Sequence, residues 1–465
     1  MKRTKIVATI SDKRCEVGFL RELFEAGMNV VRLNTAHQTL DEAMKVIQNV
    51  RAVSEQIALL IDTKGPEVRT TGVEIPVRVE KGDVVYMSGD LNLRKEKLIG
   101  VSYENFVQDV RIGDKILIDD GDVELVVQAK GDNMLELVAS NPGEIKNKKS
   151  VNVPGVSMKL QSLSEKDRNF IEFAIKNDLD FIAHSFVRSK DDVLEIQHIL
   201  DAHNSKIKII AKIENQEGVD HIDEILDHVY GVMVARGDLA IEIDAEKIPL
   251  IQRMIVNKCI ESKKPVIIAT QMLHSMIEHP RPTRAEVSDI ANAVFSGTDA
   301  VMLSGETAYG NYPAEAVKVM AKVAEANEAT LLPDSNRNLV RINNEITAAL
   351  ARAAVRMTTM LPIKAIVVDT NSGRTARYLS AFRGGHPVIA RCYEKRVMRE
   401  LALSYGVQPY FSVKPHSRDE FMRDIPQVLS EKGYQPEEQI LVVGGSFGHV
   451  RGASFMEICR ISDIK

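Results

Sequence analysis

The feature that most constrains this chain is an alternation of short apolar runs with longer segments of helical periodicity. The middles of the runs are continuously apolar, which is typical of parallel strands covered on both faces. Amphipathic stretches lie between most of them. The eight runs are Thr4–Ile10, Asn29–Asn34, Ile57–Thr63, Asp180–Val187, Lys206–Glu214, Gly231–Asp238, Pro265–Thr270 and Asp299–Glu306.

Eight strand–helix units predict an α/β fold in which the strands close into a (β/α)8 TIM barrel. An open doubly wound sheet is the alternative, because periodicity does not separate the two. The alternation of apolar runs and helical segments is interrupted once, over residues 68–153. Period-2 alternation and Gly-Asp turns replace it there. This pattern predicts a small β domain inserted into a barrel loop. Its ends, Gly65-Pro66 and Pro154-Gly155, are turn dipeptides that suit the hinges of a lid.

The 465 residues correspond to about three domains. A third unit begins after the polar segment at Leu332-Pro333-Asp334, with a helix expected near Glu345–Met360 and further alternation of strands and helices. We therefore expect a barrel of residues 1–67 and 154–333, an inserted β lid domain of residues 68–153, and a C-terminal α/β domain of residues 334–465.

Charge and cysteine usage exclude some classes of protein. With 60 Lys and Arg against 65 Asp and Glu, the net charge of −5 argues against nucleic acid as the main partner. The four cysteines are scattered without a C-x-x-C pair, which fits neither a disulfide framework nor a zinc site and favours the cytoplasm. No apolar stretch approaches the ~18 residues of a membrane helix, so no membrane partner is expected.

Polar and charged residues gather where the predicted strands end. In a (β/α)8 barrel the active site lies at the carboxyl ends of the strands. Ionisable groups converging on one barrel mouth would be costly without a ligand or ions. The residues at these ends are Arg32, Asn34, Asp62, Thr63, Lys212, Glu214, Arg236, Gly237, Asp238, Thr270, Ser304 and Glu306.

The sharpest cluster is Lys212-Ile213-Glu214, with Asp238 at the end of the next strand. Strand alternation places Lys212 and Glu214 on one face. Two neighbouring carboxylates predict a divalent metal site for Mg²⁺ or Mn²⁺. Lys212 then supplies a positive charge that suits a transferring phosphoryl group or an enolate. The alternative is a structural Lys–Glu ion pair.

Two weaker signals lie nearby. Asn34, Asp62 and Thr63 offer oxygens for a monovalent cation, although a hydrogen-bonded layer is the favoured reading of these residues alone. Backbone N–H groups at Gly237 and Asp238 could hold a carboxylate.

Several long motifs occur in order along nearly the whole chain: Leu59–Thr71, Ile209–Gly218, Val232–Leu239, Ala269–Ile277, Pro280–Val294 and Gly297–Ala308, with the opening TKIVATI and GMNVVRLN segments. Together these motifs closely resemble the pyruvate kinase family.

The resemblance implies an enzyme that transfers the phosphoryl group of phosphoenolpyruvate to ADP, giving pyruvate and ATP. Lys212 would stabilise the transferring phosphoryl group, Arg32 would bind it from the other side, and Glu214 and Asp238 would hold Mg²⁺ or Mn²⁺. The other implied roles are K⁺ binding by Asn34, Asp62 and Thr63, carboxylate binding at Gly237 and Asp238, placement of Thr270 near the enolate carbon, a proton relay through Ser304 and Glu306, and nucleotide contacts from His37, Arg69 and Lys149.

The family resemblance also carries expectations about K⁺ dependence and the oligomeric state. Glu67 is the residue type that accompanies K⁺ dependence, whereas Ala36 stands where the family has a serine ligand for K⁺. Other departures from the family pattern are Ser11-Asp12, His184, Ala240 and Tyr309. A homotetramer is the family expectation.

The turn after the first strand of the C-terminal domain matches the family's effector-phosphate loop. It reads Thr370-Asn371-Ser372-Gly373-Arg374-Thr375 and precedes a predicted helix. Hydroxyls and backbone N–H groups at a helix N-terminus can cradle phosphate. A phosphorylated sugar or nucleotide is the expected effector, with the loop Gly444–Gly452 nearby; an ordinary helix cap is the alternative.

Two other functions remain open on the sequence. One is a Mg²⁺-dependent lyase or aldolase acting through a pyruvate enolate. The other is a non-catalytic sugar-phosphate sensor, against which the intact Lys212, Glu214, Asp238 and Thr270 speak.

Overall fold

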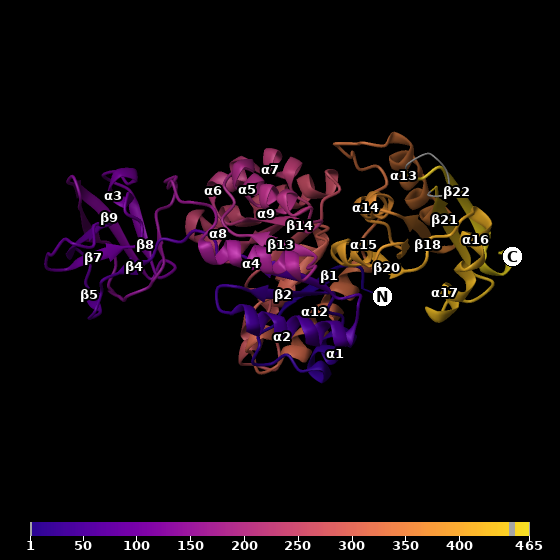
Figure 1. Ribbon diagram of the computed structural model, residues 1–465, viewed down its shortest axis with the longest axis horizontal. Helices are drawn as coiled ribbons and strands as arrows, with labels where there is room; N and C mark the ends of the chain where they lie inside the picture. Colours follow the sequence, from indigo (N-terminus) through magenta and orange to yellow (C-terminus); the bar gives the residue numbers. More distant parts are fainter. Residues whose placement is uncertain (1, 446–451, 465) are drawn as a thin grey trace.

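The computed structural model describes residues 2–445 and 452–464. All eight predicted barrel strands are present and parallel, and they close in the order β1-β17-β16-β15-β14-β13-β3-β2. The open-sheet alternative is therefore wrong. Figure 1 shows the barrel in the centre, with the inserted β unit at one end and the C-terminal α/β unit at the other.

The barrel elements follow the predicted order. Its strands are β1 (Lys5–Thr9), β2 (Val30–Asn34), β3 (Ala58–Asp62), β13 (Phe181–His184), β14 (Lys208–Ile213), β15 (Gly231–Ala235), β16 (Val266–Ala269) and β17 (Ala300–Leu303). Its helices are α1 (Val17–Glu25), α2 (Leu40–Val53), α4 (Glu165–Lys176), α5 (Lys190–Ala202), α6 (Gln216–Asp220), α7 (Ile222–His228), α8 (Arg236–Glu242), α9 (Ile248–Glu261), α10 (Arg284–Phe295), α11 (Gly305–Ala308) and α12 (Pro313–Glu328), with short 3-10 turns at Ala245–Lys247 and His274–Ile277.

Strand alternation divides the barrel into two buried layers. Phe181 and Ala183 of β13 pack inside the barrel, whereas Ile182 belongs to the layer between the strands and the helices. Leu403, from the C-terminal domain, packs in the interior cluster, so that domain closes the end of the barrel opposite the strand carboxyl ends. The functional mouth is left open at the other end.

The inserted unit is a β structure with a core of its own. Its elements are β4 (Thr70–Thr71), β5 (Val77–Val79), β6 (Val84–Ser88), β7 (Leu98–Val101), α3 (Phe106–Asp109), β8 (Lys115–Ile118), β9 (Val123–Lys130), β10 (Leu135–Ala139), β11 (Gly143–Ile145) and β12 (Val151–Asn152). Its buried residues form a cluster separate from those of the barrel. The two connecting segments run side by side, with the Val151 N–H donating to the Val68 carbonyl at 2.9 Å.

The C-terminal unit is a five-stranded sheet in the order β20-β19-β18-β21-β22, in which β22 is antiparallel to β21. Its elements are α13 (Glu345–Met360), β18 (Ile363–Thr370), α14 (Arg374–Ala381), β19 (Val388–Cys392), α15 (Lys395–Glu400), β20 (Val407–Phe411), α16 (Arg418–Arg423), α17 (Ile425–Glu431), β21 (Gln439–Gly444) and β22 (Phe455–Arg460), with 3-10 turns at Leu401–Leu403 and Ile461–Asp463. The predicted helix Glu345–Met360 is confirmed.

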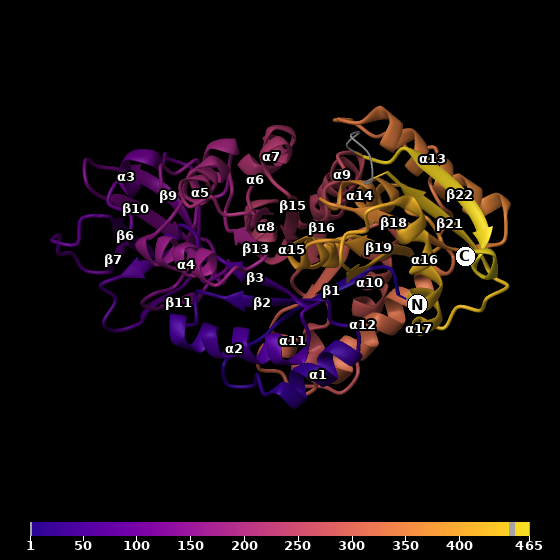
Figure 2. The ribbon, with the colours of Figure 1, turned by 45° about the vertical axis from the view of Figure 1, so that its right-hand side comes forward.

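The C-terminal unit shares a buried core with the barrel, in contrast to the inserted unit. Arg383 of the loop after α14 forms a buried ion pair with Asp299 of the barrel at 2.6 Å. Arg399 of α15 pairs in the same way with Asp180. In both figures α14 and α15 lie on the side of the sheet that faces the barrel (Figures 1 and 2). The contact between these two units is therefore both apolar and ionic.

Candidate active site

The centre of the barrel mouth is a carboxylate held between two cations. Asp62, at the end of β3, is almost fully buried. Its carboxylate contacts Arg32 Nε of β2 at 2.6 Å and Lys212 Nζ of β14 at 3.0 Å. Burial alone would raise the pKa of Asp62, but the two cations outweigh it and hold the pKa below its usual value. Arg32 also donates to the Thr9 hydroxyl at 3.0 Å, so its guanidinium is fixed from two strands.

Lys212 makes three polar contacts although only 8% of its surface is exposed. Besides Asp62, its ammonium contacts Glu214 Oε1 at 3.0 Å and the Ser185 hydroxyl at 2.7 Å. Burial opposes the charge, yet Asp62 and Glu214 raise the pKa of Lys212 above its ordinary value. The predicted placement of Lys212 and Glu214 on one face is confirmed. The ion-pair alternative also describes this geometry, since the two side chains are paired.

Glu214 and Asp238 form the carboxylate pair that the strand ends predict. Asp238, in the first turn of α8, lies within hydrogen-bonding reach of Glu214. Burial raises the pKa of both groups, and the neighbouring Asp238 raises that of Glu214 further. Glu214 is buried and Asp238 is half-buried. Two carboxylates in contact at such a site are unfavourable when both are ionised. This donor set therefore fits a divalent cation.

Glu214 and Asp238 supply two carboxylates to this candidate cation site. Among residues 2–445 and 452–464, no three His, Cys, Asp or Glu side chains gather as a metal site. Mg²⁺ commonly binds through one or two carboxylates and completes its shell with substrate oxygens and water.

The residues suggested for a monovalent cation lie on adjacent strand ends. Asn34 and Asp62 are register partners on β2 and β3. The Asn34 side-chain oxygen accepts from the Ala36 N–H at 3.2 Å, and the Thr63 hydroxyl accepts from the Ser185 N–H at 3.0 Å. The Asp62 carboxylate is already paired with Arg32 and Lys212. These contacts form the hydrogen-bonded layer that the sequence also allowed.

Thr270 adopts an unusual backbone conformation at the end of β16. Its φ is +70°, and the next residue, Gln271, is at +56°. A left-handed conformation costs energy for a β-branched residue and persists where the surroundings fix it. Here the Gly237 N–H donates to the Thr270 hydroxyl at 2.8 Å, and Arg236 donates to the Thr270 carbonyl at 2.7 Å. The chain thus holds the Thr270 hydroxyl beside the start of α8.

Ser304 and Glu306 lie together after β17. The buried Glu306 carboxylate accepts from the Ser304 N–H at 2.7 Å and from the Leu273 N–H at 3.1 Å. These bonds tie the loop after β17 to the loop that follows Thr270. In this arrangement Glu306 anchors backbone, and a proton relay through it stays a prediction.

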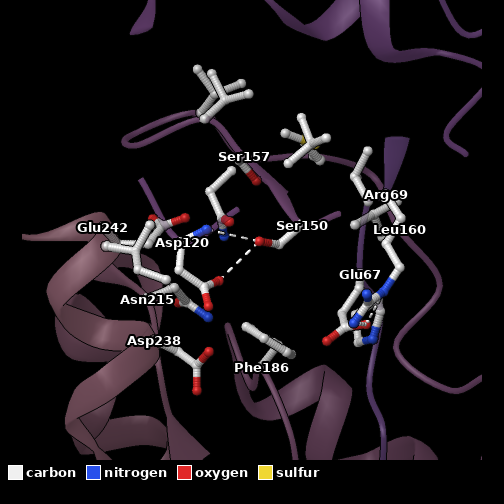
Figure 3. Close-up of a pocket in the computed structure, with 18 of the residues that line it drawn as sticks. Glu67, Arg69, Asp120, Ser150, Ser157, Leu160, Phe186, Asn215, Asp238 and Glu242 are labelled. Carbon is white, nitrogen blue, oxygen red and sulfur yellow. Dashed lines mark hydrogen bonds and ion pairs between the residues drawn. The ribbon is translucent and has the colours of Figure 1, made fainter. Parts of the chain in front are cut away.

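A cavity of about 690 Å³ lies between the barrel mouth and the inserted unit. Figure 3 shows Asp238 and Glu242 of α8 on one side and Asp120 and Ser150 of the inserted unit across from them. The Ser150 hydroxyl donates to the Asp120 carboxylate at 2.9 Å. The volume suits a small-molecule ligand, which the two units would enclose together.

Of the three residues predicted to contact the nucleotide, two line the cavity and one does not. Arg69 and Lys149 line the cavity, where Arg69 contacts Glu67 at 2.8 Å and Lys149 contacts Asp119 at 2.7 Å. His37 is exposed on the loop after β2 and is not among the residues lining this cavity. Two of the three residues therefore lie at the cavity, and a nucleotide contact from any of the three stays a prediction.

The predicted effector segment begins α14. Thr370 and Thr375 are buried, Ser372 is exposed, and Gly373 takes the left-handed conformation at φ +73°. The N-cap residue of α14 is Gly373, which has no side chain to cap the helix, and binding of a phosphate by this segment stays a prediction. Of the loop Gly444–Gly452, residues 446–451 lie outside the described residues.

Sequence reasoning missed two residues of the mouth, Ser185 and Glu242, and the positioning contact of a third, Arg236. Ser185 follows β13 and fixes Lys212, and its hydroxyl also lies 2.7 Å from the Thr63 carbonyl. Arg236, noted only as a strand-end residue, orients Thr270 and pairs with Asp289 at 2.7 Å. Glu242 lines the cavity from α8. Position after an apolar strand could have indicated Ser185, but nothing in the sequence indicates Glu242.

Among the residues that depart from the family pattern, His184 has the clearest structural consequence. It is fully buried on β13, and neither ring nitrogen has a hydrogen-bond partner among the described residues. Burial lowers the pKa of His184 to about 4, so the ring is neutral at neutral pH. The side chain acts there as a packing residue beside Ser185.

Glu242 gives a pH-dependent prediction. Burial raises its pKa to about 7, against a hydrogen bond from the Gly155 backbone. Between the ordinary carboxyl pKa and this value, the folded state keeps a proton that the unfolded state has lost, so stability falls as pH rises. We expect the unfolding temperature of Glu242→Gln, measured in EDTA, to fall less than that of the parent between about pH 5 and about pH 8.

The matched control is Glu246→Gln, at an exposed neighbouring position. It should retain the parental pH dependence. An equal fall in the parent and in Glu242→Gln would show that Glu242 titrates normally.

A closed barrel with a buried Lys–Asp–Arg cluster, a carboxylate pair and an inserted β unit over its mouth defines a barrel enzyme built for an anionic substrate and a divalent cation. Family models agree with this class. The model described as "Pyruvate kinase, barrel domain" matches residues 1–317, and "Pyruvate kinase, alpha/beta domain" matches residues 348–459.

Full-length relatives carry the same name. A pyruvate kinase of Borreliella burgdorferi is 48% identical over 99% of this chain and 98% of its own length. One of Bacillus licheniformis is 42% identical over 100% of this chain and 81% of its own length. The crystal structure of a pyruvate kinase from Cryptosporidium parvum matches with a TM-score of 0.93 and 34% identity, covering 99% of this chain and 96% of that one.

The chain belongs to the pyruvate kinase family. It is an enzyme of that type, and its reaction is the transfer of a phosphoryl group from phosphoenolpyruvate to ADP, giving pyruvate and ATP. The lyase and sensor alternatives are therefore not supported. No helix among the described residues has the length and apolar character to cross a membrane.

Proposed function

We propose that Lys212 and Arg32, the two cations on either side of Asp62, bind the phosphoryl group of phosphoenolpyruvate during its transfer to ADP. The observation that carries this is the pair of buried cations fixed on either side of one carboxylate. The P–O bond to the enol oxygen breaks while a new bond forms to a terminal phosphate oxygen of ADP. Preorganised positive charge lowers the barrier because the transferring group is anionic throughout.

Glu214 and Asp238 would hold Mg²⁺ or Mn²⁺, whose chemistry is to bridge and polarise substrate oxygens. Their contact and their burial-raised pKa values support this assignment. The substrate carboxylate would lie near the N–H groups of Gly237 and Asp238, at the start of α8.

The enolate left behind must gain a proton at carbon. Thr270 is the group we assign beside that carbon, with water as the proton source and Ser304 and Glu306 in support. The fixed Thr270 hydroxyl supports this role, because its position does not depend on substrate. Arg236 acts as a positioning residue through the Thr270 carbonyl.

We assign ADP to the cavity of 690 Å³ beneath the inserted unit. Arg69 and Lys149 would contact it, whereas His37 would have to approach by movement of its loop. Closure of this unit as a lid would exclude water from the phosphoryl donor. We further propose a cytoplasmic homotetramer, on family membership alone.

The test of the activity is release of pyruvate from phosphoenolpyruvate and ADP with Mg²⁺. We expect turnover that requires ADP and disappears with EDTA. Formation of pyruvate without ATP, at the same rate with and without ADP, would contradict phosphoryl transfer.

Potassium dependence is a separate prediction. We expect K⁺ to increase the rate, because Glu67 accompanies Asn34, Asp62 and Thr63 near the site. In this chain Ala36 replaces the family's serine ligand for K⁺. We therefore expect the parent protein to need a higher K⁺ concentration for half-maximal activation than the variant Ala36→Ser, which restores that ligand. The measurement is turnover against KCl at constant ionic strength, with tetramethylammonium as the control cation. Identical KCl curves for the two proteins would show that residue 36 does not contribute to the cation site.

A further inference from the structure

The turn that follows β13, Ser185-Phe186, contacts two side chains of the barrel mouth at once. The Ser185 hydroxyl lies 2.7 Å from Lys212 Nζ, and the Phe186 N–H donates to Glu214 Oε2 at 2.7 Å. Lys212 and Glu214 are both buried, so these hydrogen bonds help to fix the direction of each side chain. A shift of this turn would therefore displace the ammonium and the carboxylate together.

The backbone of the turn is in an unfavourable conformation. Phe186, which lines the cavity beneath the inserted unit (Figure 3), has a φ of +56°. Such a value costs energy for a bulky residue and persists where the surroundings fix it. Fixing contacts come from the segment after β3, because the Ser185 N–H donates to the Thr63 hydroxyl at 3.0 Å and the Ser185 hydroxyl lies 2.7 Å from the Thr63 carbonyl. The turn thus depends on the segment that leads into the inserted unit.

Gly65 brings this segment into close contact with the turn. It is buried, and its φ of +71° lies in the left-handed region that favours glycine. A methyl group on its Cα would lie 2.8 Å from Ser185 Cβ, 3.0 Å from Phe186 Cδ2 and 3.2 Å from the Ser185 carbonyl oxygen. A separation of 2.8 Å between two such carbons is too short for a packed interior, so a side chain at residue 65 would force a neighbour to move.

The segment is held against the turn from its other side. The Lys64 N–H donates to Asp167 Oδ1 at 2.8 Å, and Asp167 is fully buried in α4. The second oxygen of this carboxylate accepts from the Ser164 hydroxyl at 2.6 Å and from the Ser164 N–H at 3.1 Å. Because the segment is anchored in this way, the displacement caused by a side chain at residue 65 would fall on the turn.

We propose that Gly65 is a positioning residue for phosphoryl transfer, which acts on Lys212 and Glu214 through the Ser185-Phe186 turn. The lack of a side chain lets the segment lie against the turn and hold it in its left-handed conformation. This role rests on the proposed function of Lys212 and Glu214 and goes beyond that of a hinge. Groups that orient a metal-binding side chain typically contribute 10–100-fold to metal affinity or activity.

The test compares Gly65→Ala with Gly72→Ala. Gly72 has nearly the same φ, +69°, but it is exposed, and apart from its chain neighbours no described atom lies within 4 Å of an added methyl group. The two variants therefore impose similar backbone strain, and only Gly65→Ala meets the turn. We expect Gly65→Ala to weaken Mn²⁺ binding, measured by electron paramagnetic resonance without substrate, by about 10–100-fold and to lower kcat for pyruvate release by a similar factor. Gly72→Ala should leave both close to the parental values.

A measurement without ADP separates positioning from hinge motion. Exchange of the methyl protons of pyruvate needs the metal site but no transfer to ADP, so Gly65→Ala should slow this exchange. A variant that raises only the KM for ADP, with parental Mn²⁺ binding and parental proton exchange, would show that Gly65 is a hinge alone and would overturn the proposal.

Glu214→Gln distinguishes failure of this role from failure of the metal assignment. Loss of Mn²⁺ binding in Glu214→Gln but not in Gly65→Ala would contradict only the role of Gly65. Parental Mn²⁺ binding in Glu214→Gln would contradict the proposed metal site, and with it the action of Gly65 on a metal-binding carboxylate.

Hydrogen exchange of the unmodified protein in EDTA does not depend on a variant folding. The Phe186 N–H is bonded to a buried carboxylate, so we expect it to be protected, as read by mass spectrometry with fragmentation to single residues. Exchange at Phe186 as fast as in an unfolded peptide would show that the turn is not fixed and would overturn the proposal. Among the variants, Phe186 should exchange faster in Gly65→Ala than in Gly72→Ala, and equal rates would contradict displacement of the turn.

Discussion

Lys212→Met should lower the rate of phosphoryl transfer by about 10³–10⁵. The variant removes the ammonium that contacts Asp62, Glu214 and Ser185 while keeping an unbranched side chain of similar length. Arg32 still pairs with Asp62, so the mouth keeps one counter-charge. The measurement is steady-state pyruvate release from phosphoenolpyruvate and ADP, with thermal unfolding as the check on folding.

The same variant separates the two halves of the reaction. Exchange of the methyl protons of pyruvate with deuterium in solvent needs the metal and the group beside the carbon, but no phosphoryl transfer. We expect this exchange to be reduced much less than phosphoryl transfer in Lys212→Met. Thr270→Ala is the comparison, and it should reduce exchange more than Lys212→Met does. Equal loss of both activities in Lys212→Met would contradict this division of roles.

Removal of the inserted unit should leave a folded barrel with little kinase activity. Its buried residues form a core separate from that of the barrel, so deletion exposes little of the remaining core. The Val151 N–H bonds to the Val68 carbonyl at 2.9 Å, which means that the ends can be rejoined through two glycines after deletion of residues 69–150. The deletion removes one wall of the proposed ADP cavity. We expect kcat/KM to fall by at least about 100-fold, because even a small misplacement of the reacting groups can lower the rate by that factor.

The readouts for the deletion are cooperative thermal unfolding and pyruvate release. The control carries the same two glycines inserted after Asp132, in a turn of the intact unit, and should retain both properties. An insoluble or non-cooperative deletion variant would show that the inserted unit belongs to the folding core of the barrel. Near-parental activity would show that it is not needed to bind ADP.

The alternation of apolar runs and amphipathic segments was sufficient to predict eight parallel strands with helices between them, because each strand is buried on both faces and reads as a continuous apolar run. Residues 68–153 stood out for the opposite reason: their period-2 pattern follows from a sheet with one buried face. Periodicity did not establish closure of the barrel, since hydrogen bonding between β1 and β17 joins residues almost 300 positions apart and leaves no local pattern.

The charged strand ends were predictable as a set, but their pairing was not. Alternation placed Lys212 beside Glu214, whereas the contact of Lys212 with both Asp62 and Ser185 depends on the stagger of three strands. Glu242 was missed because a carboxylate on a short helix looks like an ordinary solvated residue. In the structure Glu242 is half-buried and contacts the Gly155 backbone, a contact between distant segments that the sequence does not encode locally.

The ion pairs of Lys212 also determine how this side chain reacts with carbonyl compounds. An ordinary lysine is neutral in about one molecule in 2,500 at pH 7, and only that neutral amine can attack a ketone. Asp62 and Glu214 raise the pKa of Lys212, so the neutral fraction is smaller still. Pyruvate, the product, is an α-keto acid, and in the site we propose it is released next to this amine. We therefore expect Asp62 and Glu214 to disfavour condensation of Lys212 with pyruvate into an imine, and borohydride added during turnover should leave Lys212 unmodified.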